Sequence, residues 1–143
     1  MSVKQISVFL ENKAGALSDM TRILADNNID MRAFSLSEAS DFGIARVIVD
    51  DIYKATTVLK DAGYVHSVSE VLAVAIPDVP GGLNKILTVL SELDINLEYM
   101  YAFLGAKKNA AYMIMKTSDP AKISAVLTGK GIRLAEQEEL SEM

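Results

Sequence analysis

The chain has 143 residues, of which half are hydrophobic and 23% are charged, so we expect one ordinary folded domain or two very small ones. Acidic side chains outnumber basic ones by 19 to 14, and the net charge of −5 argues against a nucleic-acid partner, whose phosphates require Lys and Arg. The lack of cysteine excludes disulfides, thiolate nucleophiles and zinc fingers, and a single histidine excludes a multi-histidine metal site.

The first half of the chain shows, in order, the patterns of a strand, a helix, two strands, a helix and a strand. Alternating apolar residues indicate the strands, and apolar residues at helical spacing indicate the helices. Gly63 follows the second helix, where a C-terminal cap is expected. The predicted elements cover residues 3–10, 17–26, 30–38, 43–50, 52–62 and 64–70.

The second half repeats this order. Pro120 opens its second helix, at a position where proline is tolerated, and Gly131 closes that helix before a final strand. We expect residues 138–143 to fray. The predicted elements that precede the final strand cover residues 71–76, 83–90, 95–104, 110–116 and 120–130.

The two halves also share a sequence motif. The stretch Asn12-Lys13-Ala14-Gly15-Ala16-Leu17 returns 66 residues later as Asp78-Val79-Pro80-Gly81-Gly82-Leu83. Further along, Gly63 matches Gly131 at an offset of 68. A nearly constant offset of this kind is typical of a duplicated unit.

Each half therefore has the order βαββαβ, which is the ferredoxin-like plan of an antiparallel sheet with helices on one face. We expect an α+β protein with two such domains side by side, over residues 1–70 and 71–143. No segment rich in Gly, Ser or Pro separates them.

The repeated loops, residues 11–17 and 77–83, are the candidate binding sites. Each loop leads through a glycine into a helix, whose first N–H groups have no partner and lie at the positive end of the helix dipole. A small carboxylate binds well at such a place, and glycine lets it approach the backbone closely. The alternative is that Gly15 and Gly81 only satisfy the geometry of a turn.

These loops resemble the N-x-P-G-x-L motif that opens ACT domains. The stretches 28–31 (Asn-Ile-Asp-Met) and 94–97 (Asp-Ile-Asn-Leu) are similar to the N-I-x-hydrophobic second strand of that family. The resemblance covers the whole chain twice and implies a tandem ACT-domain protein, built from modules that bind amino acids as regulatory effectors at the interface between paired domains. Two departures are Ala14, where the motif has proline, and Asp78, where it has asparagine.

The family's pairing implies two unlike pockets. Residues 12–17 would face Asn96, whose amide, with that of Asn12, accepts from an ammonium or donates to a carboxylate. Residues 78–83 would face Asp30, so that two carboxylates favour a cation, unless Asp30 and Asp78 are simply surface acids. We favour the first pocket. The candidate ligand-binding residues are Asn12, Lys13, Ala14, Gly15, Ala16, Leu17, Asp30, Asp78, Gly81, Gly82, Leu83 and Asn96.

We therefore expect a non-catalytic regulatory protein that binds a small amino acid, with no catalytic residue, metal or cofactor. No catalytic domain fits in 143 residues, so a metabolic enzyme would be regulated in trans. One alternative is an interaction adaptor without a small ligand. A small acylphosphatase-like enzyme is a weaker alternative, because that chemistry requires an arginine at a phosphate loop and the Gly-Leu loops contain none.

Assembly and location are the remaining expectations. Uncovered sheet edges favour a homodimer. The longest apolar run, Val71–Pro77, is far shorter than the roughly 20 residues of a membrane-spanning helix, and the first residues lack a signal-peptide pattern, so we expect a cytoplasmic protein without a membrane partner.

Two further features stand out from the strand patterns. The aromatic residues Tyr99, Tyr101 and Phe103 alternate as in RNA-binding sheets, but the acidity of the chain opposes RNA, and we expect them to be buried between the two copies. Arg46 interrupts an apolar strand and is expected at a surface edge.

Overall fold

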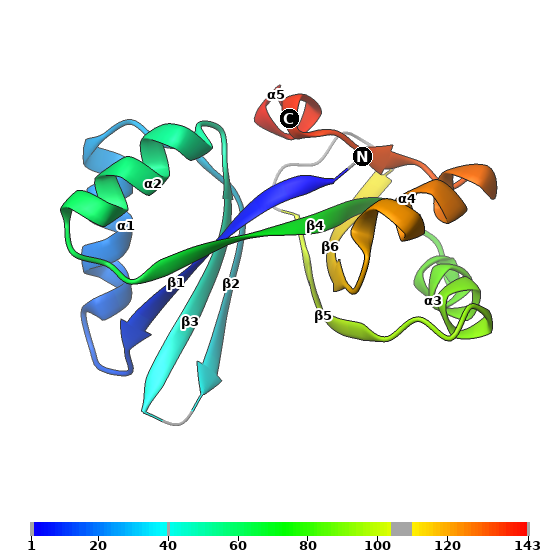
Figure 1. The fold of residues 1–143 in the computed structure, drawn as a ribbon, viewed down its shortest axis with the longest axis horizontal. Coiled ribbons are helices and arrows are strands. Elements are labelled where there is room, and N and C mark those ends of the chain that lie inside the picture. The colour runs from blue at the N-terminus through cyan, green and yellow to red at the C-terminus, as the bar shows by residue number, and fades with distance from the viewer. Residues whose placement is uncertain (1, 40, 104–109, 143) are drawn as a thin grey trace. The chain divides into compact units, whose positions relative to one another are not determined.

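The computed structural model describes residues 2–39, 41–103 and 110–142 (Figure 1). The chain falls into an N-terminal unit, residues 4–69, and a C-terminal unit, residues 70–141, to which Val3 also belongs. The elements are β1 (Val3–Glu11), α1 (Ala16–Asp26), β2 (Met31–Ala39), β3 (Phe42–Val49), α2 (Ile52–Asp61), β4 (His66–Pro77), α3 (Gly82–Glu92), β5 (Leu97–Ala102), β6 (Ala110–Thr117), α4 (Pro120–Gly129), β7 (Leu134–Ala135) and α5 (Gln137–Glu142).

The N-terminal unit is an antiparallel sheet in the order β2-β3-β1-β4, with α1 and α2 on one face (Figure 1). Alternate residues of β1 point to opposite faces, and those on the helix side form the core with both helices. The residues that β1, α1 and α2 contribute to this core are Ile6, Val8, Leu10, Met20, Leu24, Ala55 and Leu59. Burial of these apolar side chains holds the two helices on the sheet.

The C-terminal unit repeats the plan with β4, α3, β5, β6, α4 and β7. Its strands pair in the order β4-β6-β5, and the two-residue β7 pairs with β4. The core residues from β4, α3 and α4 are Leu72, Val74, Ile76, Ile86, Leu90, Ile123 and Leu127. The predicted α+β class, with two ferredoxin-like βαββαβ units, is therefore confirmed.

The backbone turns of one unit recur in the other. Positive φ angles occur at matching positions, 66 or 68 residues apart, where most L-residues are strained. The matched pairs are Gly15 (89°) with Gly81 (82°), Asn28 (56°) with Asp94 (55°), and Gly63 (83°) with Gly131 (79°). The sequence repeat therefore reflects a repeat of the backbone itself.

The strand β4 corrects one expectation. The sequence pattern predicts two strands, over residues 64–70 and 71–76, but the structure has one strand of 12 residues, His66–Pro77. Nothing interrupts it, since no glycine, proline, asparagine or aspartate lies between His66 and Ile76. The two units divide within this strand, between Ser69 and Glu70, and the division into domains at residue 70 stays a prediction.

Two other expectations are wrong. Residues 137–142 form the helix α5 rather than a frayed end, and its Leu140 is fully buried. Arg46 does not lie at a sheet edge, because β3 lies between β2 and β1, and its Nη1 donates to Ser37 Oγ at 2.9 Å. The predicted strand end at residue 104 and residue 143 lie outside the described residues.

Candidate functional site

The loop before α1 has the geometry that the sequence predicts for it. Gly15 adopts a φ of 89° and is the N-cap, with no side chain capping the helix. The loop closes on itself, because the amide of Lys13 donates to the Glu11 carbonyl at 2.9 Å and that of Ala16 to the Lys13 carbonyl at 3.3 Å. The next amides, of Leu17 and Ser18, have no acceptor within the helix. They are available to an anion.

The loop before α3 has the same geometry. The amide of Val79 donates to the Pro77 carbonyl at 2.8 Å, and that of Gly82 to the Val79 carbonyl at 3.0 Å. Gly81 is the N-cap, with a φ of 82°. The turn is tighter here, because a Cβ at Gly82 would overlap the Pro77 carbonyl oxygen. The turn requires Gly82 as well as Gly81.

Four candidate residues of the N-terminal loop line one pocket of about 270 Å³. Asn12 is exposed there, and its side chain makes no hydrogen bond to any part of the chain that the structure describes. An apolar wall and the carboxylate of Glu38 complete the pocket. It is lined by Leu10, Glu11, Asn12, Lys13, Ala16, Leu17, Leu36, Ser37, Glu38 and Gly43.

An ion pair lies at the rim of this pocket. Lys13 Nζ is 2.9 Å from Glu11 Oε2, and both side chains are exposed. The hydrogen bond and the charge of Lys13 lower the pKa of the Glu11 carboxyl, and Glu11 raises the pKa of Lys13 in return. The two charges at the rim therefore balance each other.

Asn96 lies in a separate hollow, within the C-terminal unit. The hollow has a volume of about 300 Å³ and is lined by Leu87, Leu90, Ser91, Asp94, Ile95, Asn96 and Leu97. Asn96 and residues 12–17 belong to different units, as do Asp30 and residues 78–83. Both expected pairings stay predictions.

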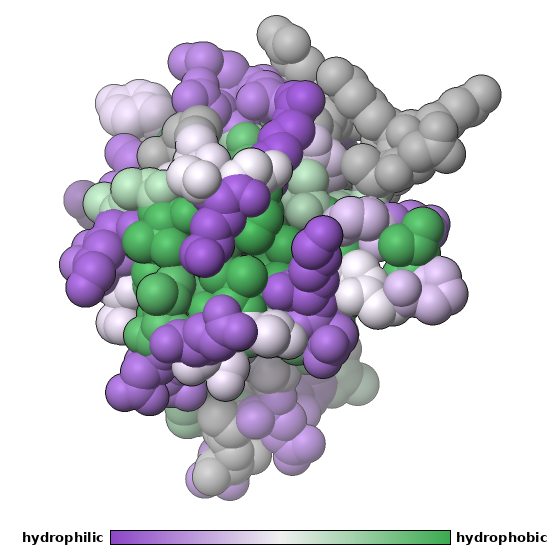
Figure 2. All heavy atoms as spheres, turned by 90° about the vertical axis from the view of Figure 1, so that its right-hand side faces the viewer, coloured by the Kyte–Doolittle hydropathy of each residue, from purple (hydrophilic) through white to green (hydrophobic). Residues whose placement is uncertain are grey.

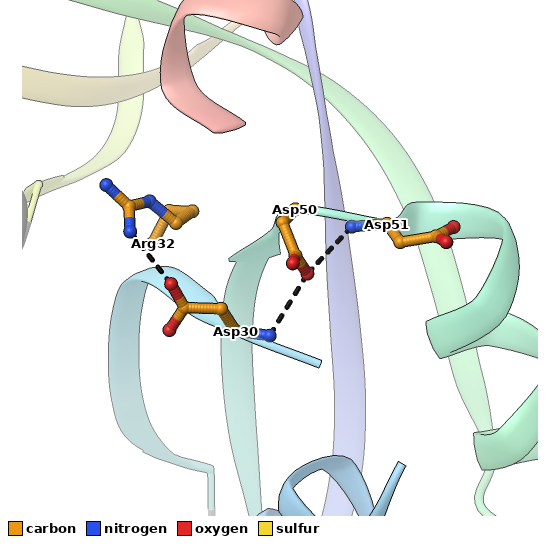
Figure 3. A network of polar contacts seen from close by, with 4 residues as sticks. All are labelled: Asp30, Arg32, Asp50 and Asp51. Atoms are coloured by element: carbon orange, nitrogen blue, oxygen red, sulfur yellow. Dashed lines mark hydrogen bonds and ion pairs between the residues drawn. The ribbon is translucent and has the colours of Figure 1, made fainter. Parts of the chain in front are cut away.

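Asp30 already has a cationic partner within its own unit (Figure 3). Its Oδ2 is 2.8 Å from Arg32 Nη1, and its amide donates to Asp50 Oδ1 at 3.0 Å. The same Asp50 oxygen accepts from the amide of Asp51 at 2.9 Å. Arg32 balances the charge of Asp30 within the N-terminal unit, and the expected cation-binding pocket stays a prediction. No cluster of three or more metal-ligating side chains is found over residues 2–39, 41–103 and 110–142.

The aromatic strand is not an exposed stacking surface. Phe103 is 9% exposed and packs edge-on against Tyr112, with ring centroids 6.4 Å apart. Tyr99 and Tyr101 are half-buried.

Part of the site is not predicted from the sequence. Leu36, Ser37 and Glu38 come from β2 and lie beside the loop. Arg32, the partner of Asp30, is not predicted either, although opposite charges two residues apart on a strand point to the same face. That spacing is the available signal for Arg32.

The fold and the loops define a class of protein: two ferredoxin-like units in one chain, each with a glycine turn that opens its first helix. The family model for the ACT domain pair matches residues 1–143, so the chain belongs to that family. A comparison with curated proteins gave no match.

Solved structures share this fold. Protein BT0572 from Bacteroides thetaiotaomicron is 38% identical, with a TM-score of 0.92, and the match covers 100% of this chain and 98% of that one. The regulatory subunit of aspartate kinase from Thermus thermophilus, in its ligand-free form, is 15% identical, with a TM-score of 0.65 and 86% of each chain covered. The Thermus flavus subunit is 14% identical, with a TM-score of 0.61, and 97% of this chain and 90% of that one are covered. The two subunits show a likeness of fold alone.

The structure also bears on membrane association. Among the described residues, no helix is long and apolar enough to cross a membrane.

Proposed function

We propose that this protein is a non-catalytic regulator that binds a free amino acid at the loop of residues 12–17. The observation that carries the proposal is the pocket beside Asn12, in a chain whose full length matches the ACT domain pair. The pocket combines the unpaired helix amide of Leu17, the free side-chain amide of Asn12 and an apolar wall. An amino acid presents the matching groups.

The chemistry of the pocket suggests how an amino acid is held. The amide of Leu17, a residue that lines the pocket, suits the ligand carboxylate, since it lies at the positive end of α1. The amide oxygen of Asn12 and the carboxylate of Glu38 are acceptors for the ligand ammonium. A volume of about 270 Å³ suits a small ligand, and the leucines of the wall suit an apolar side chain.

The wider role belongs to the same proposal. The Thermus subunits are by name regulatory subunits of aspartate kinase, and they share the fold. By analogy, this chain regulates a metabolic enzyme in trans when its amino acid binds. A ligand shifts the equilibrium between two conformational states of a regulator only through its different affinities for those two states. Asn96 as a second ligand residue, the homodimer and a cytoplasmic location stay predictions.

Thermal-shift measurements with each of the twenty amino acids test the proposal. We expect one amino acid, or a related group, to raise the melting temperature of the wild-type protein. Stabilisation is about 2.7 kcal/mol at a ligand concentration a hundred times Kd. The Asn12→Ala variant should lose the shift. The matched control is Asn84→Ala, on the exposed side of α3, which should keep it.

If no amino acid raises the melting temperature of the wild type, the regulator proposal fails and the adaptor becomes the better account. If Asn12→Ala and Asn84→Ala respond alike, the protein binds amino acids but not at this loop.

A further inference from the structure

The C-terminal unit contains a second pocket, which the proposed amino-acid site does not use. Its volume is about 450 Å³, within the roughly 300–1,000 Å³ that is common for small-molecule sites. It lies between the end of β4, the first two turns of α3 and the segment that follows α4. It is lined by Ala75, Ile76, Pro77, Lys85, Ile86, Val89, Lys130, Gly131, Ile132 and Arg133.

The same place in the N-terminal unit is a smaller pocket of about 280 Å³. The backbones correspond, because the amide of Phe9 donates to the Val65 carbonyl at 3.0 Å and that of Ala75 to the Arg133 carbonyl at 2.8 Å. At matching positions, Phe9 and Tyr64 line the smaller pocket, while Ala75 and Ile132 line the larger one. Loss of two aromatic rings on a similar backbone accounts for the larger hollow.

The charges of the two pockets also differ. Asp19, Glu11 and Lys13 line the N-terminal pocket. At the positions of Asp19 and Glu11, the C-terminal pocket has Lys85 and Pro77. The larger pocket is thus lined by three basic side chains and by no acidic one, in a chain with a net charge of −5. Figure 2 shows an apolar surface edged by hydrophilic side chains on the side of the molecule that carries α3 and α4.

Two of these three cations have no acidic partner among the residues that the structure describes. Arg133 Nη2 is 2.7 Å from Glu139 Oε2, so Glu139 already balances its charge. Lys85 and Lys130 are exposed and form no ion pair within residues 2–39, 41–103 and 110–142. Two ammonium groups therefore lie beside an apolar cavity.

We propose that this pocket binds a small organic anion, namely a monocarboxylate with an apolar body. The body would pack on Ile76, Ile86, Val89 and Ile132, where removal of apolar surface from water is favourable. The carboxylate would lie at the rim, where Lys85 and Lys130 donate charge-assisted hydrogen bonds. The ammonium of a free amino acid is repelled by the same lysines. The proposal does not depend on the amino-acid site, because this pocket is lined neither by residues 12–17 nor by Asn96.

Octanoate and octan-1-ol, which differ in the acidic group, test this with the full-length protein. By isothermal titration calorimetry we expect octanoate to bind at one site per chain. We expect octan-1-ol to bind at least tenfold more weakly. Added salt should weaken octanoate binding, because the lysines at the rim are exposed. Equal affinity for the two probes, or no binding of octanoate, would overturn the proposal.

Two pairs of substitutions locate the site. The Lys85→Gln/Lys130→Gln variant should bind octanoate roughly tenfold more weakly. The matched control, Lys54→Gln/Lys60→Gln, removes the same charge from exposed positions on α2 and should bind like the wild type. If both variants lose affinity equally, the effect comes from net charge and the assignment is wrong.

A third variant fills the pocket. Ala75→Phe/Ile132→Tyr introduces the aromatic residues that the N-terminal unit has at these positions, and it should abolish octanoate binding. Circular dichroism checks that it folds; if it does not, the lysine variants decide. Asn12→Ala should bind octanoate normally, so failure of this proposal and failure of the amino-acid proposal are separate results.

Discussion

Asp51 and Asp119 lie 68 residues apart, and each caps the N-terminus of the second helix of its unit. Asp51 Oδ1 accepts from the amide of Lys54 at 3.0 Å, and Asp119 Oδ1 from that of Lys122 at 3.3 Å. The repeat therefore extends to side-chain contacts.

These caps should contribute measurably to stability. Asp51→Ala removes an acceptor for a helix amide and should lower the free energy of unfolding by about 1 kcal/mol. Asp119→Ala should cost more, because Asp119 has a φ of 49°, a conformation that alanine adopts less readily. Urea denaturation measures both. The control variants Asp51→Asn and Asp119→Asn retain an acceptor and should stay near the wild type; equal losses for Asn and Ala would contradict the capping role.

The glycine turns should resist substitution independently of any ligand. Gly15→Ala and Gly81→Ala each place a Cβ on a left-handed residue and should cost roughly 1–2 kcal/mol of folding free energy. Gly129, the last residue of α4, has open space around it and no positive φ. Gly129→Ala is the matched control and should be neutral, or stabilising by about 0.4–1 kcal/mol. Thermal denaturation would contradict this account if all three variants lost stability alike.

The ion pair of Glu11 and Lys13 predicts a pH dependence. The hydrogen bond and charge of Lys13 lower the pKa of Glu11 in the folded state, so the pair stabilises the fold above the ordinary carboxyl pKa. That contribution is lost as the pH falls through the lowered pKa. In Lys13→Gln, the pKa of Glu11 should rise towards its ordinary value in a carboxyl-carbon NMR titration. Lys54→Gln should leave it unchanged, and an unchanged Glu11 pKa in Lys13→Gln would show that the pair does not form in solution.

Open sheet edges predict a homodimer. Within the described residues, β2 pairs with β3 alone, and its Leu36 is 52% exposed. Such an edge offers unpaired backbone groups to a second copy. Light scattering at micromolar concentration should give about twice the 15.5 kDa chain mass. A mass near that of one chain would contradict the prediction.

Much of the fold follows from local patterns in the sequence. Gly15 and Gly81 mark the two helix starts, because positive φ angles favour glycine and the motif repeats at a fixed offset. Leu17, Met20 and Leu24 show helical spacing, and the structure places Met20 and Leu24 in the core. The element order needs no long-range information.

The predictions that are wrong or incomplete concern features that depend mainly on contacts between residues distant in sequence. The boundary between the sequence repeats predicts a break after Glu70, but β4 runs through it as one strand, His66–Pro77. α5 is rich in charge, and burial of its single leucine, Leu140, is not visible in a local pattern. The β2 wall of the pocket depends on which strands lie together. Arg32, the partner of Asp30, is different, because it lies only two residues away and local spacing could have predicted it.

Calorimetric titration with the amino acid that raises the melting temperature most is the most direct test of the central claim. Asn12→Ala and Asn96→Ala should each lose about 1–3 kcal/mol of binding free energy, because polar ligand groups would be left unpaired. Asp78→Ala should lose much less, since the second loop is not the proposed site. If both asparagine variants bind as tightly as the wild type, the site assignment is wrong.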